Sequence, residues 1–571
     1  GLVGSEMCIR DSIDTTGENV VADEYLIRTA AMSDASASAV TVNASAAIGA
    51  ANGAAVADAS ATGESISTGI GGGSGDDNIN NLSAIDATAD ANATASSTTV
   101  TASLALGSGD NVATGNSGAS ASATATGIDG GDGIDEIINA ASIFAGGTEG
   151  SPMAEARAGS TTVTVGITVG EADNAASANA SALAEANAAA IAGGSGGDTI
   201  TNTGTLMAGS ATEPDESTGP LALALASSET IDVGITLGDA DSAATSDSSS
   251  TAVSDISGIQ GGAGGDVIGN SGAINTFSSA EALGQSATTS VSLSLGLSEG
   301  ESTANAASRS IALGTGIDGG ADADTITTDG TVAVDVRSEA RTLSSGLNLE
   351  LVSIGASDQS AEANASATAD AVARGVYGGD GGDTITAAGN FSVKADSFVD
   401  SKAVANTSGG FSVGESVKQA QSRAETTAHA LAIGIDGGAG DDDIVDAAVL
   451  IIESVANATA TGVSSSNSGL NLAGSSTGES MSDASTMVSA EAVGIRGGEE
   501  EPGSVETDSD TITATAPLTV TAEATGSAQS ESSTDVVAIF GSADGSAAAD
   551  ASALVLARGV GIDGGADDDR I

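Results

Sequence analysis

Apolar and polar residues alternate with a period of two along most of the chain. Segments such as 163–169 (VTVGITV) and 291–297 (VSLSLGL) place an aliphatic residue at every second position, and 119–128 (ASASATATGI) alternates Ala with Ser or Thr. A period of two is typical of a β-strand, whereas a helix repeats its apolar face every 3.6 residues. The pattern therefore predicts strands throughout, including the Ala-rich segments that helix propensity alone would assign to helix.

A glycine- and aspartate-rich block recurs nine times between these strands. Copies read GIDGGDGIDEI from Gly127, GIQGGAGGDVI from Gly258 and GVYGGDGGDTI from Gly375. The Ile that closes each copy falls at positions 79, 137, 200, 268, 326, 385, 444, 512 and 571, so most copies lie 58 or 59 residues apart. A fixed period of this length indicates repeats that must stack on their neighbours to bury a face.

The repeat divides the chain into a partial first repeat at 13–68 and an array at 69–571, with repeats that begin near 69, 127, 190, 258, 316, 375, 434, 494 and 561. Two acidic, Pro-containing insertions, 213–220 and 499–509, lengthen two of the spacings. We expect both insertions to be surface loops.

The first twelve residues, GLVGSEMCIRDS, match no repeat and contain the single Cys. They resemble translated sequencing-adapter read-through, so we exclude them from fold reasoning as a non-native artefact; the alternative is an ordinary N-terminal tail. Because the last residue falls inside a repeat, we expect the chain to be an internal fragment of a longer protein.

Each repeat contains three segments with a period of two. One follows the block (ITNTGTL from Ile200), the most apolar comes next (IDVGITL from Ile231), and an Ala/Ser alternation leads into the following block. We therefore predict an all-β fold, a parallel β-solenoid of the β-helix or β-roll kind with about three strands per repeat. Ala, Ser and Gly cannot fill a hollow triangular coil, so we expect a flattened coil whose sheets lie close together.

The composition excludes several classes of function. The chain has 77 Asp and Glu against 14 Lys and Arg, a net charge of −63, which excludes nucleic acid and disfavours anionic membrane surfaces as partners. No segment approaches eighteen apolar residues, so we expect no membrane span. One His and one Cys leave zinc sites, Cys/His nucleophiles and disulfide frameworks without their residues, and we expect no enzyme activity.

The glycine–aspartate block resembles the glycine-rich nonapeptide of haemolysin-type (RTX) calcium-binding proteins. GGSGGDTI, GGDGIDEI and GGDGGDTI match GGxGxD followed by one residue and a large apolar residue. The resemblance implies a parallel β-roll, calcium ions held in the turns, and export by a Gram-negative type I route. Carried over residue by residue, it implies that the metal ligands are Asp77, Asp135, Asp198, Asp266, Asp324, Asp383, Asp442 and Asp569.

The chemistry of the block supports calcium on separate grounds. Calcium takes six to eight oxygen ligands, and glycines with φ > 0 can aim successive carbonyl groups into a turn. The block departs from the family pattern because it occurs once per 58 residues, because Asp322 and Asp567 replace a glycine, and because an insertion interrupts the copy that holds Asp510. The alternative is a glycine-rich turn with solvated acids and no metal.

Two classes of function follow. The first is a calcium-binding structural and adhesive repeat region of a large secreted or cell-surface bacterial protein, whose partners would be calcium ions and surface glycans or proteins. The second is a calcium-dependent spacer or binding module attached to an enzyme outside this chain. The low content of large apolar residues leaves a disordered acidic polymer as a third alternative. An extracellular or cell-surface location is expected for the first two classes.

Overall fold

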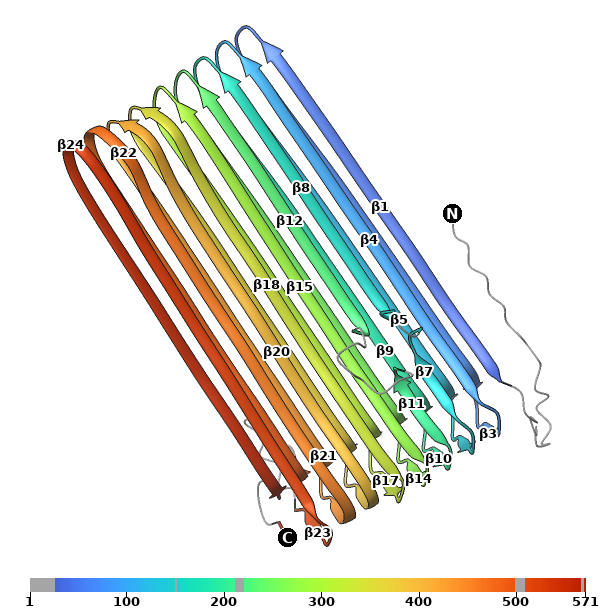
Figure 1. Ribbon diagram of the computed structural model, residues 1–571. Helices are drawn as coiled ribbons and strands as arrows, with labels where there is room; N and C mark the ends of the chain where they lie inside the picture. Colours follow the sequence, from blue (N-terminus) through green and yellow to red (C-terminus); the bar gives the residue numbers. More distant parts are fainter. Residues whose placement is uncertain (1–25, 149–150, 211–219, 499–508, 566–568) are drawn as a thin grey trace.

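The chain forms an all-β parallel β-solenoid (Figure 1). The computed structural model describes residues 26–148, 151–210, 220–498, 509–565 and 569–571, and these contain no helix. Residues 1–12, nearly all of both insertions, and Asp567 lie outside these ranges.

Each coil has an outgoing strand, a tight turn, a return strand, the glycine–aspartate block and a short strand. The outgoing strands are β1 (Ile27–Ala47), β4 (Ile85–Ala105), β7 (Ile143–Gly146) with β8 (Ala154–Thr168), β11 (Thr205–Gly209) with β12 (Ala222–Thr236), β15 (Ala273–Ser294), β18 (Thr331–Ile354) and β20 (Thr384–Val413). The return strands are β2 (Ala51–Ser74), β5 (Gly109–Asp132), β9 (Ala172–Ser195), β13 (Ala240–Ala263), β16 (Ser298–Ala321), β19 (Ser357–Asp380) and β21 (Ser416–Ala439).

The short strands lie at the edge that carries the blocks, which we call the glycine–aspartate edge. They are β3 (Asn78–Asn81), β6 (Glu136–Asn139), β10 (Thr199–Asn202), β14 (Val267–Asn270), β17 (Thr325–Thr328) and β23 (Thr511–Ala514). The last two long elements, β22 (Asp443–Gly498) and β24 (Leu518–Asp563), each pair as an outgoing arm and then as a return arm. The turns that join outgoing to return strands form the opposite edge (Figure 1).

Neighbouring coils pair in parallel with the register that the repeat predicts. Ile79 pairs with Ile137, Ile137 pairs with Ile200, and the row continues through every closing Ile as far as Ile512. Arg570 then bridges to Thr511. The closing Ile residues therefore form one continuous row from Ile79 to Ile512.

The interior changes in character from one edge to the other. Large aliphatic side chains such as Ile85, Ile128 and Ile137 are buried near the glycine–aspartate edge, and each fully buried side chain of this size contributes about 2–3 kcal/mol. Buried Ala residues occupy the middle of the strands, and buried Ser, Thr and Asn follow toward the opposite edge. The large apolar side chains of the core are therefore concentrated near the glycine–aspartate edge of the flattened solenoid.

The two sheets of the solenoid are close enough for side chains of one to reach the backbone of the other. The hydroxyl of Thr99 on β4 donates a hydrogen bond to the carbonyl of Thr114 on β5 at 2.9 Å, and Thr230 makes the equivalent bond to Thr245 at 2.7 Å. A hollow interior would not allow these contacts. The prediction of a flattened coil is confirmed.

The predicted strand that follows each block, such as 200–206, is interrupted in the coils that contain β3, β6, β10, β14 and β17. The chain leaves β10 after Asn202 and begins β11 at Thr205, and the Asn202 side chain bonds both the N–H and the carbonyl of Gly204 in this break. In β20 and β22 the corresponding residues run on as one strand.

Candidate metal centre: an aspartate ladder at the glycine–aspartate edge

The turns of the glycine–aspartate edge use glycines with positive φ, as the sequence predicts. Gly194 and Gly196 have φ of 110° and 128°, and the same two positions are positive in the other described blocks that keep both glycines. In the block from Gly316, Asp322 takes the place of the second of these glycines with φ of 74°. The substitution therefore preserves the turn and places a non-glycine residue in a region that L residues disfavour.

The eight predicted aspartates are brought together into one ladder. Oδ1 of Asp198 accepts a hydrogen bond from the backbone N–H of Asp135 at 2.8 Å, and Oδ1 of Asp266 accepts one from the N–H of Asp198 at 2.7 Å. The same bond recurs in each step of the stack, which runs in order through Asp77, Asp135, Asp198, Asp266, Asp324, Asp383, Asp442, Asp510 and Asp569.

Asp510 belongs to this ladder although an insertion interrupts its block in the sequence. The N–H of Asp442 donates to Asp510 Oδ1 at 2.9 Å, and the N–H of Asp510 donates to Asp569 Oδ1 at 3.1 Å. The signal that identifies Asp510 is the Thr-Ile that follows it, because Ile512 occupies the position of the closing Ile.

The second oxygen of each carboxylate lies over a glycine of its own block. A Cβ at Gly193 would lie 2.8 Å from Asp198 Oδ2, and one at Gly261 would lie 2.5 Å from Asp266 Oδ2. The carbonyl oxygen of Gly261 in the next coil would lie even nearer, 2.4 Å from a Cβ at Gly193, so this position must be glycine. Among the described residues, Oδ2 has no hydrogen-bond partner in Asp77, Asp135, Asp198, Asp266, Asp324 and Asp383.

The ladder places carboxylates in a buried column. Asp198, Asp266 and Asp383 are each 1% exposed, and adjacent strands of a sheet are about 4.8 Å apart. Burial raises the pKa of Asp266 to about 6 and that of Asp324 to about 7, and neighbouring carboxylates add to the rise while the backbone N–H bond opposes it. Such a column requires positive charge, from protons or from cations.

The donor chemistry of the ladder fits calcium, although acidic side chains alone do not form a complete shell. The unpartnered carboxylate oxygens are the hard ligands that calcium prefers. Within the described residues, however, no group of three or more His, Cys, Asp or Glu side chains converges in a way that could hold a metal ion. A calcium ion at this edge would therefore take one or two carboxylates of the ladder and complete its shell with backbone carbonyls or water.

A second ladder, of asparagines, runs beside the aspartates. Asn139 Nδ2 donates to Asn202 Oδ1 at 2.8 Å, and Asn202 Nδ2 donates to Asn270 Oδ1 at 2.8 Å. Asn81 begins the ladder and Thr328 ends it. In the sequence this ladder is visible as an Asn two positions after the closing Ile. The period of two places these Asn residues on the same face of their strands, but it does not show that they bond to each other.

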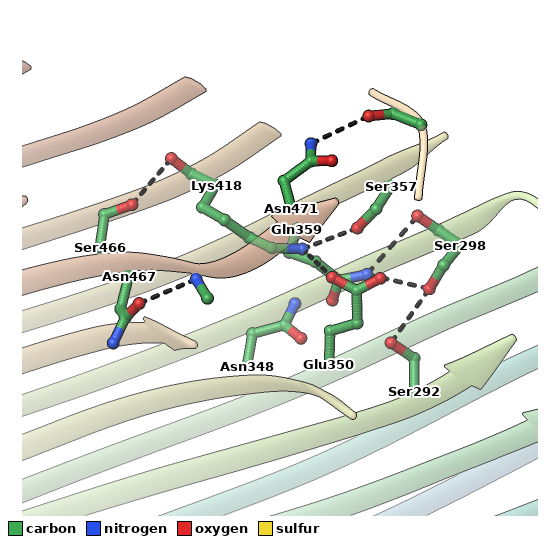
Figure 2. A network of polar contacts seen from close by, with 12 residues as sticks. Ser292, Ser298, Asn348, Glu350, Ser357, Gln359, Lys418, Ser466, Asn467 and Asn471 are labelled. Atoms are coloured by element: carbon green, nitrogen blue, oxygen red, sulfur yellow. Dashed lines mark hydrogen bonds and ion pairs between the residues drawn. The ribbon is translucent and has the colours of Figure 1, made fainter. Parts of the chain in front are cut away.

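A buried polar network lies near the opposite edge (Figure 2). Lys418 on β21 pairs with Glu350 on β18 and donates to the hydroxyl of Ser357 at 2.7 Å, and both charged side chains are fully buried. Gln359 donates to Ser298 at 3.1 Å, beside Gly300, where a Cβ would lie 2.1 Å from Gln359 Oε1. Glycines thus make room for the large polar side chains. Sequence analysis missed this network.

Asp232 is a buried carboxyl in the interior of another coil, in the same row as Asn348. It lies on β12 between Thr164 and Ser290 of the neighbouring coils, and it is fully buried. Burial raises the pKa of Asp232 to about 8, while the nearby Ser242 side chain and the backbone of Val233 oppose the rise. The carboxyl is therefore mostly protonated at pH 7.

Comparison with known proteins finds no matching family model, no matching curated protein and no matching solved structure. The described part of the chain contains no helix that is long and apolar enough to cross a membrane.

Proposed function

We propose that the chain is a calcium-binding structural and adhesive repeat region of a large secreted or cell-surface bacterial protein. The observation that carries the proposal is the continuous column of buried aspartates at the glycine–aspartate edge, each joined to the next coil by a backbone hydrogen bond. The likeness of the block to haemolysin-type nonapeptides supports the same cation.

Calcium would act on this fold as a stiffening ion. Each coil contacts only its neighbours, so the stability of the stack depends on the contacts between adjacent coils. Ionised carboxylates in the ladder repel one another across these contacts, and a divalent cation would replace that repulsion with attraction. Because an ion that binds only the folded chain stabilises it by mass action, the solenoid would be most rigid where calcium is abundant, as it is outside cells.

An adhesive role is supported by a groove of about 1380 Å³ that crosses the return strands. One wall is a row of outward-facing residues that pair in register, in which Asn116 donates to Asp58 at 2.7 Å and Asn305 donates to Asp247 at 2.7 Å. Amide and carboxylate groups repeated at strand spacing could bond the hydroxyl groups of a glycan or the backbone of a protein segment. A spacer attached to an enzyme would have the same glycine–aspartate edge. Flanking sequence would distinguish the two roles, because further repeats favour the adhesive region and a catalytic domain favours the spacer.

An Asp266→Asn variant tests the calcium site. Asn keeps an oxygen that can accept the bond from Asp198 N–H but removes the charge, so calcium stoichiometry in equilibrium dialysis should fall by about one or two ions. Without calcium the variant should melt at a higher temperature than the parent, because one repelling charge is gone; in millimolar calcium this advantage should disappear. Asp329→Asn, a matched change at an exposed residue of a neighbouring turn, should alter neither measurement.

Magnesium provides the control for the ion, because it requires tight octahedral geometry and retains its waters. It should raise the melting temperature much less than calcium at equal concentration. Two results together would contradict the calcium site. Asp266→Asn would bind as much calcium as the parent, and it would melt above the parent by the same amount with and without calcium. The block would then be a metal-free turn.

A further inference from the structure

The outgoing sheet exposes an aliphatic surface near the opposite edge. Val165 and Ile167 on β8 point away from the interior, and Ile167 is 42% exposed. Register places equivalent side chains beside them, such as Val233 and Ile235 on β12. We call this surface the aliphatic face; it consists of Val42, Ala44, Ala46, Ile48, Val100, Ala102, Leu104, Leu106, Val163, Val165, Ile167, Val169, Ile231, Val233, Ile235, Leu237, Thr289, Val291, Leu293, Leu295, Leu347, Leu349 and Leu351.

The interior of the same strands explains why these side chains lie outside. Thr162 and Thr164 alternate with the aliphatic residues and are fully buried, and Thr162 donates across the slab to the carbonyl of Ser177 at 2.9 Å. A Cβ at Gly166 would lie 2.5 Å from Asn174 Oδ1, so the sheets are too close here to accept a larger side chain. The strand cannot exchange its faces without separating the sheets.

The face carries no charge, although the chain has a net charge of −63. Acidic residues border it in the turns of the opposite edge, as Glu171 and Asp239 do, but none lies within the rows that define it. Its four rows of side chains cover about 25 Å along the strands. The six outgoing strands that carry them, β1, β4, β8, β12, β15 and β18, cover about 29 Å across the sheet. The area of the face is therefore roughly 700 Å². Patches of this size on soluble proteins mark interaction sites.

We propose that the aliphatic face is the interface of a symmetric dimer, with a second copy of this chain as its occupant. A standard interface buries about 800 Å² per partner, and each copy of this face supplies nearly that area. A two-fold axis would bring the same flat patch of each copy together, with the two sheets about 10 Å apart. The proposal does not depend on calcium binding.

The net charge determines the conditions in which this dimer forms. Two copies repel each other at low ionic strength, and at about 0.1 M salt the screening length is about 10 Å. Salt also strengthens apolar association when its anion is strongly hydrated, as with sulfate. We therefore expect association to increase with ionic strength, the opposite of a contact held by ion pairs.

Sedimentation equilibrium of the full chain in 0.5 M sodium sulfate with chelator tests the proposal. The parent should sediment as a dimer, and Ile235→Glu, which buries an unpaired carboxylate at the interface, should raise the dimer dissociation constant by more than about 100-fold. Val112→Glu is the matched control, because Val112 is 50% exposed on the return strand β5 outside this face; it should dimerise like the parent. Circular dichroism shows whether each variant is folded.

A second variant does not depend on introducing a charge. Ile235→Thr keeps a β-branched residue and should weaken the dimer about tenfold, because it removes buried apolar area. A parent that stays monomeric at 100 µM in every salt would overturn the proposal, as would equal dimerisation of the parent and Ile235→Glu. A monomer that floats with neutral phosphatidylcholine vesicles, and loses this binding in Ile235→Glu, would overturn it in favour of lipid.

Discussion

Lys418 and Glu350 form an ion pair inside the slab although they are 68 residues apart and belong to neighbouring coils. Burial lowers the pKa of Lys418, and the carboxylate of Glu350 opposes that change. The pair resembles nothing in the surrounding repeats, whose equivalent interior positions hold Ser, Asn, Gln or Gly. The ion pair is therefore a feature of these two coils and is not part of the repeat.

The pair should show strong energetic coupling. Lys418→Met leaves the Glu350 carboxylate buried without its partner, so the variant should lose about 3–5 kcal/mol of stability. The double variant Lys418→Met with Glu350→Gln should recover most of this loss. Chemical denaturation gives the energies, and hydrogen exchange shows whether the loss is confined to adjacent coils. Additive effects of the two substitutions would contradict the pairing.

Without metal, stability should increase as the pH falls from about 8 to about 5. The folded-state pKa values of Asp266, Asp324 and Asp232 are raised to about 6, 7 and 8, above the value near 3.9 of an unfolded chain. Their contribution is fully present below the unfolded pKa and is lost as the pH rises through the folded values. Melting temperatures in chelator across this range measure the trend, and a flat profile would contradict it.

The calcium effect should have the opposite dependence on pH. Calcium binds the ionised carboxylate, so protons compete with it at the ladder. The rise in melting temperature on adding calcium should therefore shrink between pH 8 and pH 5. Asp266→Asn, which cannot be protonated, should show a smaller change with pH than the parent.

Asp322→Gly should stabilise the chain by about 0.5–1 kcal/mol, because glycine adopts the positive φ of this turn without steric cost. Gly264→Ala, at the equivalent position one coil earlier, should destabilise by more than that amount. Its φ is 114°, and its Cβ would lie 2.2 Å from the carbonyl oxygen of Gly196. Thermal denaturation of both variants makes the comparison; similar effects of the two substitutions would contradict the turn geometry.

The two asparagine rows should differ in their contributions. Asn202→Ala removes bonds to Asn139, Asn270 and Gly204 in a buried ladder, and should cost about 2–3 kcal/mol. Asn179→Ala removes one half-exposed bond to Asn116 on the outer face and should cost less than about 1 kcal/mol. Equal losses on denaturation would show that the buried ladder adds nothing beyond a surface bond.

The sequence by itself determined the strands, the period and the register. Because the block recurs in phase, stacked coils must bring Asp198 beside Asp266 and Ile200 beside Ile268, and the structure confirms both pairings. It also shows that the insertion does not remove Asp510 from the ladder, since the residues after an insertion can resume the register when its ends lie close together.

Only the tertiary structure decided which face of each strand lies inside. A period of two separates Val163, Val165 and Ile167 from Thr162 and Thr164, but it does not state which set is buried. The distance between the sheets decides this. Small and polar side chains bring the sheets within hydrogen-bond reach, as between Thr162 and Ser177, and the aliphatic residues of the same strand then lie outside. That distance depends on both strands of a coil together, so no single segment of the sequence contains it.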